Sequence, residues 1–229
     1  TVSIIPAVTS HLTLLNNKAA KATEESAARI TGLISLPCSV GLAVLAEPVM
    51  SLLGGYSGEK LVLAASLMRL LGVCVFLYAG VQLTNAIMQA HGYAHIPVVN
   101  MLLCGAMKLA VVYILVGNPN IGIIGAPIGA IVCYLCIALL NNFSIGRKFT
   151  EKPAIIRNLL RAALPALIMG ALVLLSYQGL IFLLGKAASR IILCGIPIAV
   201  GVAVYLVAAV VFHSITRDAC LLLKKKKKI

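Results

Sequence analysis

The sequence predicts an all-α protein, a polytopic bundle of transmembrane helices. Hydrophobic residues make up 61% of the chain and charged residues only 11%, whereas charged residues are about 25% of a soluble domain. Six apolar runs reach the length of about 20 residues that a hydrocarbon core requires. We place six full spans at 30–53, 61–88, 96–116, 121–143, 159–184 and 191–213.

The segment before the first span divides into an apolar and a polar part. Residues 1–9 (TVSIIPAVT) are apolar but too short to span. They lack an initiator Met and a charged n-region, so they are not a signal peptide. We expect the end of a truncated helix here, and a chain that is the C-terminal part of a longer protein. Residues 10–29 are polar and helix-forming, and we expect an amphipathic cytoplasmic connector, so that 1–29 forms the first region.

Four further regions follow along the chain. Residues 30–143 hold four spans, 144–158 form a cytoplasmic loop, 159–213 hold a final helix pair, and 214–229 form a polybasic tail. Loops 117–120 and 185–190 are short, which predicts antiparallel neighbours. Four spans contain a proline that would kink them, either as ordinary packing or to allow bending during transport: Pro37, Pro127, Pro165 and Pro197.

The basic residues predict the orientation of the chain. Of 19 lysines and arginines, 14 lie in the segments on one side of the predicted spans and three on the other. By the positive-inside rule, 10–29, 89–95, 144–158 and the C-terminus are cytoplasmic, and 54–60, 117–120 and 185–190 lie outside, in a multi-pass membrane protein. This distribution argues against nucleic acid as the partner of a net charge of +13. The run Lys224–Lys228 is expected to anchor the topology and to contact anionic lipids.

The sequence contains no pattern of residues for chemical catalysis. No carboxylate pair and no Ser/His/Asp arrangement is present, and we expect neither an enzyme nor a cofactor. Cys133 and Cys136 form a CxxC within an apolar helix, which indicates packing rather than a metal or redox site. Gly125 and Gly129 belong to a small-residue face that permits close helix contact in lipid.

Lys108 is the most informative single residue. It lies near the middle of span 96–116, where a cation costs about 2.5–3.5 kcal/mol on insertion scales and usually faces a polar partner or a wet cavity. It would meet the phosphate of a lipid-linked substrate or bond to carbonyls of a kinked neighbour. Arg69 is closer to the outer end of its span, where it can snorkel to the interface.

A polar stripe accompanies this lysine. Tyr78, Gln82, Asn85 and Gln89 are spaced by 4, 3 and 4 residues, which places them on one helix face. Side-chain amides suit sugar hydroxyls. The stripe either lines a cavity or forms an interhelical hydrogen-bonded seam. With Asn100 and Lys108, these residues form the candidate substrate pathway.

Two stretches resemble a known family. They are SIIPAVTSH with LISLPCSVGLAVLAEPVMSLLGG, and IMQAHGYAHIPVVNMLLCGAMKLAVVYILVGNPNIGIIGAPIGAIVCYLCIALLNNF. Both are similar to the oligosaccharidyl-lipid flippases of the multidrug/oligosaccharidyl-lipid/polysaccharide (MOP) exporter superfamily, in particular to the stage V sporulation protein B branch, which is related to the lipid II flippase. The resemblance implies the C-terminal half of a 14-helix, MATE-like transporter of the bacterial cytoplasmic membrane, whose missing N-terminal lobe is its partner.

The resemblance also implies a function. We expect a flippase that moves a polyprenyl-diphosphate-linked saccharide, a precursor of peptidoglycan or of another cell-wall polysaccharide, by alternating access between two lobes. The alternatives are a multidrug or cation antiporter of the same superfamily, a membrane enzyme acting on polyprenyl lipids, and a non-transporting scaffold of cell-wall synthesis. A buried carboxylate in the missing lobe would favour an antiporter, and an enzyme would require grouped acidic or His residues at a membrane mouth.

Overall fold

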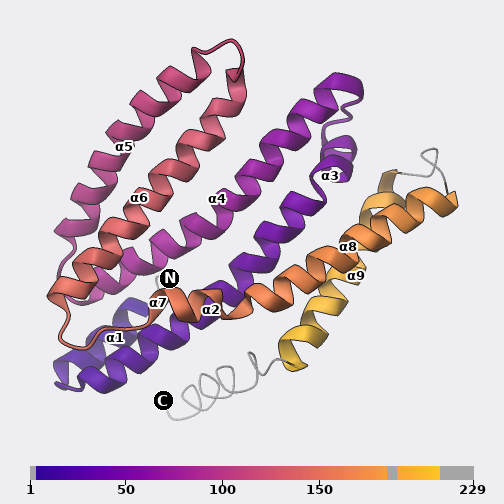
Figure 1. Cartoon of the computed structure of the whole chain (residues 1–229). Coiled ribbons are helices and arrows are strands. Elements are labelled where there is room, and N and C mark those ends of the chain that lie inside the picture. Colours follow the sequence, from indigo (N-terminus) through magenta and orange to yellow (C-terminus); the bar gives the residue numbers. More distant parts are fainter. Residues whose placement is uncertain (1–3, 185–189, 212–229) are drawn as a thin grey trace. The chain divides into compact units, whose positions relative to one another are not determined.

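A computed structural model describes residues 4–184 and 190–211, and this part of the chain is helical without strands. Figure 1 shows the helices in chain order. They are α1 (Ile4–Thr13), α2 (Asn17–Val44), α3 (Ala46–Leu53), α4 (Gly58–Ala90), α5 (His95–Val116), α6 (Gly125–Lys148), α7 (Ile155–Leu159), α8 (Ala163–Leu184) and α9 (Arg190–Val211), with 3₁₀ turns at Gly122–Ile124 and Leu160–Ala162.

The helix lengths confirm the predicted all-α polytopic membrane bundle. Five helical segments are long and apolar enough to cross a membrane, and a shorter apolar segment covers Leu193–Ala209 of α9. Helices satisfy their own backbone hydrogen bonds, which lipid cannot do for them. Their outward faces carry large exposed apolar side chains, for example Leu102, Leu109 and Tyr113 on α5.

The first predicted span, 30–53, is two helices rather than one. α2 ends at Val44 and α3 begins at Ala46, with Leu45 at φ −93° and ψ 18° between them. Pro48 explains the break, because a proline has no N–H for the carbonyl four residues earlier and its ring collides with that carbonyl. α2 also begins at Asn17, so most of the predicted connector 10–29 is continuous with the apolar helix that follows.

The four prolines differ in their effect. Pro37 and Pro197 lie inside α2 and α9, as expected for residues that remove a helical hydrogen bond. Pro127 and Pro165 are each the third residue of their helices, α6 and α8. Each follows a 3₁₀ turn, Gly122–Ile124 or Leu160–Ala162, which contains the carbonyl four residues before the proline. Both prolines therefore lie where the α-helical hydrogen bonding of the span is interrupted, as expected for a residue without a backbone N–H.

The chain forms two compact units, which group its segments by packing rather than by order along the sequence. The first comprises residues 1–32 and 74–160, and the second comprises residues 33–73 together with the part of the structure after Leu160. α2 and α4 each contribute to both units. Within the first, a buried apolar cluster joins α2, α4, the end of α6 and α7, and it includes Ala28, Leu83, Ile87, Phe149 and Leu159.

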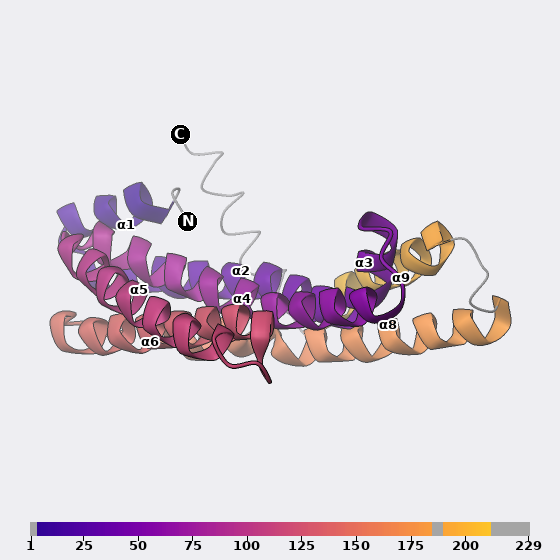
Figure 2. The ribbon, with the colours of Figure 1, turned by 90° about the horizontal axis from the view of Figure 1, so that it is seen from above.

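Within the first unit, α5 and α6 form an antiparallel hairpin whose helices lie side by side in both Figure 1 and Figure 2. A Cβ added at Gly129 would lie 2.4 Å from Val112 Cγ2, and one at Gly125 would lie 2.6 Å from Leu115 Cβ. These two glycines therefore let the helices approach closely, which confirms the packing role predicted for them.

Within the second unit, α8 and α9 are antiparallel neighbours, and α3 also contacts α9. Gly201 of α9 lies against Val173 of α8, where an added Cβ would come within 2.8 Å of Val173 Cγ2. The Tyr205 hydroxyl of α9 donates a hydrogen bond to the Leu33 carbonyl of α2. The predicted final helix pair thus packs as a pair and is held to α2 by a polar contact.

Candidate functional site

The predicted polar stripe on α4 divides into an exposed and a buried part. Tyr78 is 45% exposed and Gln89 is also exposed, whereas Gln82 is half-buried and Asn85 is buried. The Gln82 amide donates a hydrogen bond to the Tyr78 hydroxyl one turn earlier. The structure therefore pairs Tyr78 with Gln82 on the accessible face and separates both from Asn85.

Asn85 belongs to a buried polar cluster, which we call the asparagine cluster and which comprises Thr84, Asn85, Asn100 and Asn141. The Asn141 amide nitrogen donates to Asn85 Oδ1 at 2.7 Å and to Thr84 Oγ1 at 3.0 Å. Its carbonyl oxygen accepts from the Asn100 amide at 2.9 Å. All four side chains are buried, and Asn141 is 0% exposed.

The asparagine cluster joins three helices of the first unit, since its members come from α4, α5 and α6. Of the two alternatives left by the sequence, Asn85 and Asn100 form an interhelical hydrogen-bonded seam in this conformation. A buried amide left without partners costs about 1–3 kcal/mol, so the cluster fixes the relative register of the three helices. A role of these residues in a substrate pathway stays a prediction.

Asn141 is the central member of the cluster, and the sequence analysis did not single it out. The signal that could have found it is the buried stripe of α6, in which Cys133, Ile137, Asn141 and Ile145 recur every four residues and are all buried. A polar residue at an otherwise apolar core position requires partners on the neighbouring helices.

Lys108 lies on α5 and is half-buried. Its ammonium lies near the thiols of Cys74 on α4 and Cys133 on α6. It forms no hydrogen bond or ion pair with any residue in the described part of the chain. Thiols are weak acceptors, so the ammonium keeps its capacity to bind an anion.

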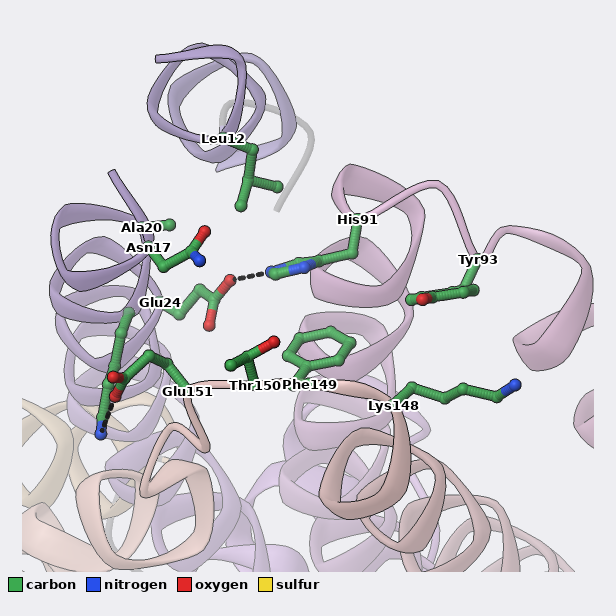
Figure 3. A pocket seen from close by; sticks show the side chains of 11 residues that line it. Leu12, Asn17, Ala20, Glu24, His91, Tyr93, Lys148, Phe149, Thr150 and Glu151 are labelled. Atoms are coloured by element: carbon green, nitrogen blue, oxygen red, sulfur yellow. Dashed lines mark hydrogen bonds and ion pairs between the residues drawn. The ribbon is translucent and has the colours of Figure 1, made fainter. Parts of the chain in front are cut away.

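A second polar group lies where α2, the end of α4 and the segment after α6 meet, and Figure 3 shows it closely. Here a cavity of about 160 Å³ is bordered by two ion pairs. His91 Nε2 lies 2.6 Å from Glu24 Oε1, and Lys21 Nζ lies 3.2 Å from Glu151 Oε2. The Phe149 ring stacks on the His91 ring with centroids 3.8 Å apart.

Glu24 is the buried acidic residue among those that the structure describes, with a side chain only 1% exposed. From the sequence, Glu24 was expected to belong to an amphipathic cytoplasmic connector. Neighbouring Glu25 accepts a hydrogen bond from the Ala154 backbone N–H at 3.1 Å. The polar start of α2 is thus packed into the first unit. The pattern that could have indicated this is the recurrence of Ala20, Glu24, Ala27 and Ala28, all buried, at helical spacing.

These features define a multi-pass α-helical membrane protein whose spans hold a buried hydrogen-bonded cluster and a lysine that pairs with none of the described acidic residues. The family model described as Lipid II flippase MurJ matches residues 1–189. The chain belongs to this family. Its members are flippases of lipid-linked precursors, and they are transporters rather than enzymes. The match confirms the resemblance to the lipid-linked saccharide flippases of the superfamily.

Two other comparisons gave no match. Neither the curated proteins nor the solved structures contain one that is significantly similar to this chain.

Proposed function

We propose that the protein moves a polyprenyl-diphosphate-linked saccharide across the bacterial cytoplasmic membrane by alternating access. The observation that carries this proposal is the family match, which spans residues 1–189 and so includes the helix bearing Lys108. A peptidoglycan precursor is the substrate that the family description favours. In this proposal the bundle works against a second lobe, and the headgroup crosses between them while the polyprenyl tail remains in lipid.

Lys108 is proposed to bind the diphosphate. Its half-buried ammonium has no acidic partner among the described residues. A bound phosphate would offset the cost of burying this charge, because charge-assisted hydrogen bonds are about twice as strong as neutral ones. Tyr78 and Gln82 are proposed to meet the sugar hydroxyls from the accessible face of α4. Asn85 and Asn100 can contact the substrate only if the hydrogen bonds of the asparagine cluster break. Gln89, which is exposed, lies at the end of the proposed substrate pathway.

The orientation remains part of the proposal. The cavity beside Glu24 and His91 is proposed to face the cytoplasm, since it lies among segments 10–29, 89–95 and 144–158, where the basic residues gather. The C-terminus is proposed to be cytoplasmic as well. Its lysine run, which lies outside the described residues, would contact anionic lipids.

The experiment is a flipping assay on the full-length protein in liposomes, with fluorescent lipid II as substrate. Lys108→Ala should lower the initial rate about tenfold or more, because a phosphate contact of a desolvated charge is lost. Lys108→Arg should retain most of the rate. Arg69→Ala, which removes an exposed cation paired with Glu47 at 3.9 Å, is the matched control. An unchanged rate in Lys108→Ala would refute the role of this residue, and no flipping by the unaltered protein would refute the function.

One observation favours the antiporter alternative enough to be tested. The Glu24–His91 pair places a buried carboxylate beside a cavity, and buried carboxylates serve proton coupling in transporters. If the protein is an antiporter, proteoliposomes with an imposed pH gradient will expel a cationic dye, and Glu24→Gln will abolish this. Dye efflux without lipid flipping would favour the antiporter, and neither activity would favour a scaffold.

A further inference from the structure

A second cavity, of about 380 Å³, lies in the second unit, formed by α3, the 54–58 loop, the start of α4, α8 and α9. Its volume falls within the range of small-molecule sites, about 300–1,000 Å³. We call it the outer cavity, because the positive-inside rule that predicts cytoplasmic 10–29 and 89–95 segments predicts that the 54–60 loop between them lies outside. Its described polar lining consists of one carboxylate and four hydroxyls: Glu47, Ser51, Tyr56, Ser57 and Tyr177.

One face of α3 and one face of α8 line the outer cavity. Glu47 and Ser51 are four residues apart on α3, and Tyr177 and Ile181 are four apart on α8, so each pair lies on one helix face. The break before α3 that Pro48 imposes turns this short helix away from the line of α2. The apolar part of the lining comes from α4, α8 and α9, and includes Leu61 and Leu193.

The sequence GGYSG at 54–58 places the remaining hydroxyls. Gly55 and Gly58 have φ values of +62° and +60°, a conformation that favours glycine. A Cβ at Gly54 would lie 2.3 Å from Tyr56 Cε2, so the Tyr56 ring folds back over this glycine. The turn therefore brings Tyr56 and Ser57 to the cavity wall.

The charge of the lining indicates what fits. Glu47 is the one ionised side chain among the described lining residues. Its partner Arg69 lies at 3.9 Å, with both side chains more than half exposed, and such a pair contributes little and leaves the carboxylate able to accept hydrogen bonds. A carboxylate disfavours a phosphate or another anion. Hydroxyls that both donate and accept, next to tyrosine rings, suit a neutral polyhydroxylated ring.

We propose that the outer cavity binds a neutral sugar ring, namely the saccharide of the lipid-linked precursor after it has crossed the membrane. That the sugar belongs to the precursor rests on the proposed function. The Tyr56 and Tyr177 hydroxyls and the Glu47 carboxylate hydrogen-bond the ring hydroxyls, and the tyrosine rings cover its apolar face. The outer cavity thus binds the headgroup on the outer side of the membrane, after the substrate has entered from the cytoplasmic side.

The test is saturation-transfer NMR on the full chain in nanodiscs, with glucose and glucuronate as probes, which differ only in a carboxylate at C6. Glucose should bind, and glucuronate should bind about fivefold more weakly because its charge lies near Glu47. Tyr177→Phe should weaken glucose binding about fivefold through the loss of one hydrogen bond. Glu47→Gln should reduce the discrimination between the probes. Tyr113→Phe, which alters an 83% exposed tyrosine on α5, is the matched control.

Several results would overturn this inference: no saturation of glucose, tighter binding of glucuronate, or equal effects of Tyr177→Phe and Tyr113→Phe. A flipping assay on the same preparation separates the inference from the function. Flipping without sugar binding overturns the outer cavity alone. Sugar binding without flipping overturns the proposed function and leaves the outer cavity as a sugar site.

Discussion

Replacing Asn141 by alanine should loosen the first unit measurably. The substitution removes two donated hydrogen bonds and one accepted hydrogen bond, to Thr84, Asn85 and Asn100. Side-chain hydrogen bonds between membrane helices average about 0.6 kcal/mol, so three are worth about 2 kcal/mol. The partners are buried and retain unsatisfied polar atoms, which adds to the loss. We therefore expect the free energy of unfolding to fall by about 2–4 kcal/mol.

The assay is equilibrium unfolding of the full chain in mixed micelles, followed by circular dichroism. The matched control is Asn142→Ala, because Asn142 is the next residue, is half-buried and forms no side-chain hydrogen bond to the described residues. It should change the free energy of unfolding by less than about 0.5 kcal/mol. Equal losses in the two variants would show that the asparagine cluster does not hold the three helices, and the reasoning would fail.

Three further predictions concern a glycine contact, the Glu24–His91 pair and the orientation in the membrane. Gly32→Ala should prevent stable folding, because its Cβ would lie 2.0 Å from the Leu159 carbonyl oxygen. The control Gly146→Ala, where the added Cβ meets no atom within 4 Å, should keep or slightly raise the melting temperature. Similar melting temperatures of the two variants would contradict this packing. Glu24→Gln should lower the free energy of unfolding by about 1–3 kcal/mol, since the charge-assisted hydrogen bond to His91 at 2.6 Å is lost. An unchanged denaturation midpoint would contradict a stabilising role of the Glu24–His91 pair. A cysteine at Lys152 in a cysteine-free background should react with an impermeant maleimide only in inverted vesicles, and labelling of intact cells would reverse the proposed orientation.

The sequence predicts the helices well, because their signal is local. Apolar length alone located the helices that the structure shows as α4, α5, α6, α8 and α9, to within a few residues. The division of 30–53 into α2 and α3 could also have been read from Pro48.

The polar contacts were harder to predict, because they depend on which helices are neighbours. Spacing placed Asn85 on a polar face of α4, but its partner Asn141 is 56 residues away in the sequence. Glu24 lies in a segment whose composition is that of a solvated helix, and only its pairing with His91, 67 residues away, accounts for its burial. The sequence shows that burying a side-chain amide or carboxylate without a partner costs free energy. Which residue becomes its hydrogen-bond partner depends on how the helices pack.

The close approach of α5 and α6 has a consequence for biosynthesis. Only eight residues separate the two helices, and their glycine contacts join positions close together in the chain, so the pair can form before any distant segment has been synthesised. We expect α5 and α6 to pair during translation and membrane insertion, so that the later helices pack onto an already formed hairpin. Side chains larger than hydrogen at 125 and 129 would then delay maturation of the nascent protein, in addition to weakening the finished one.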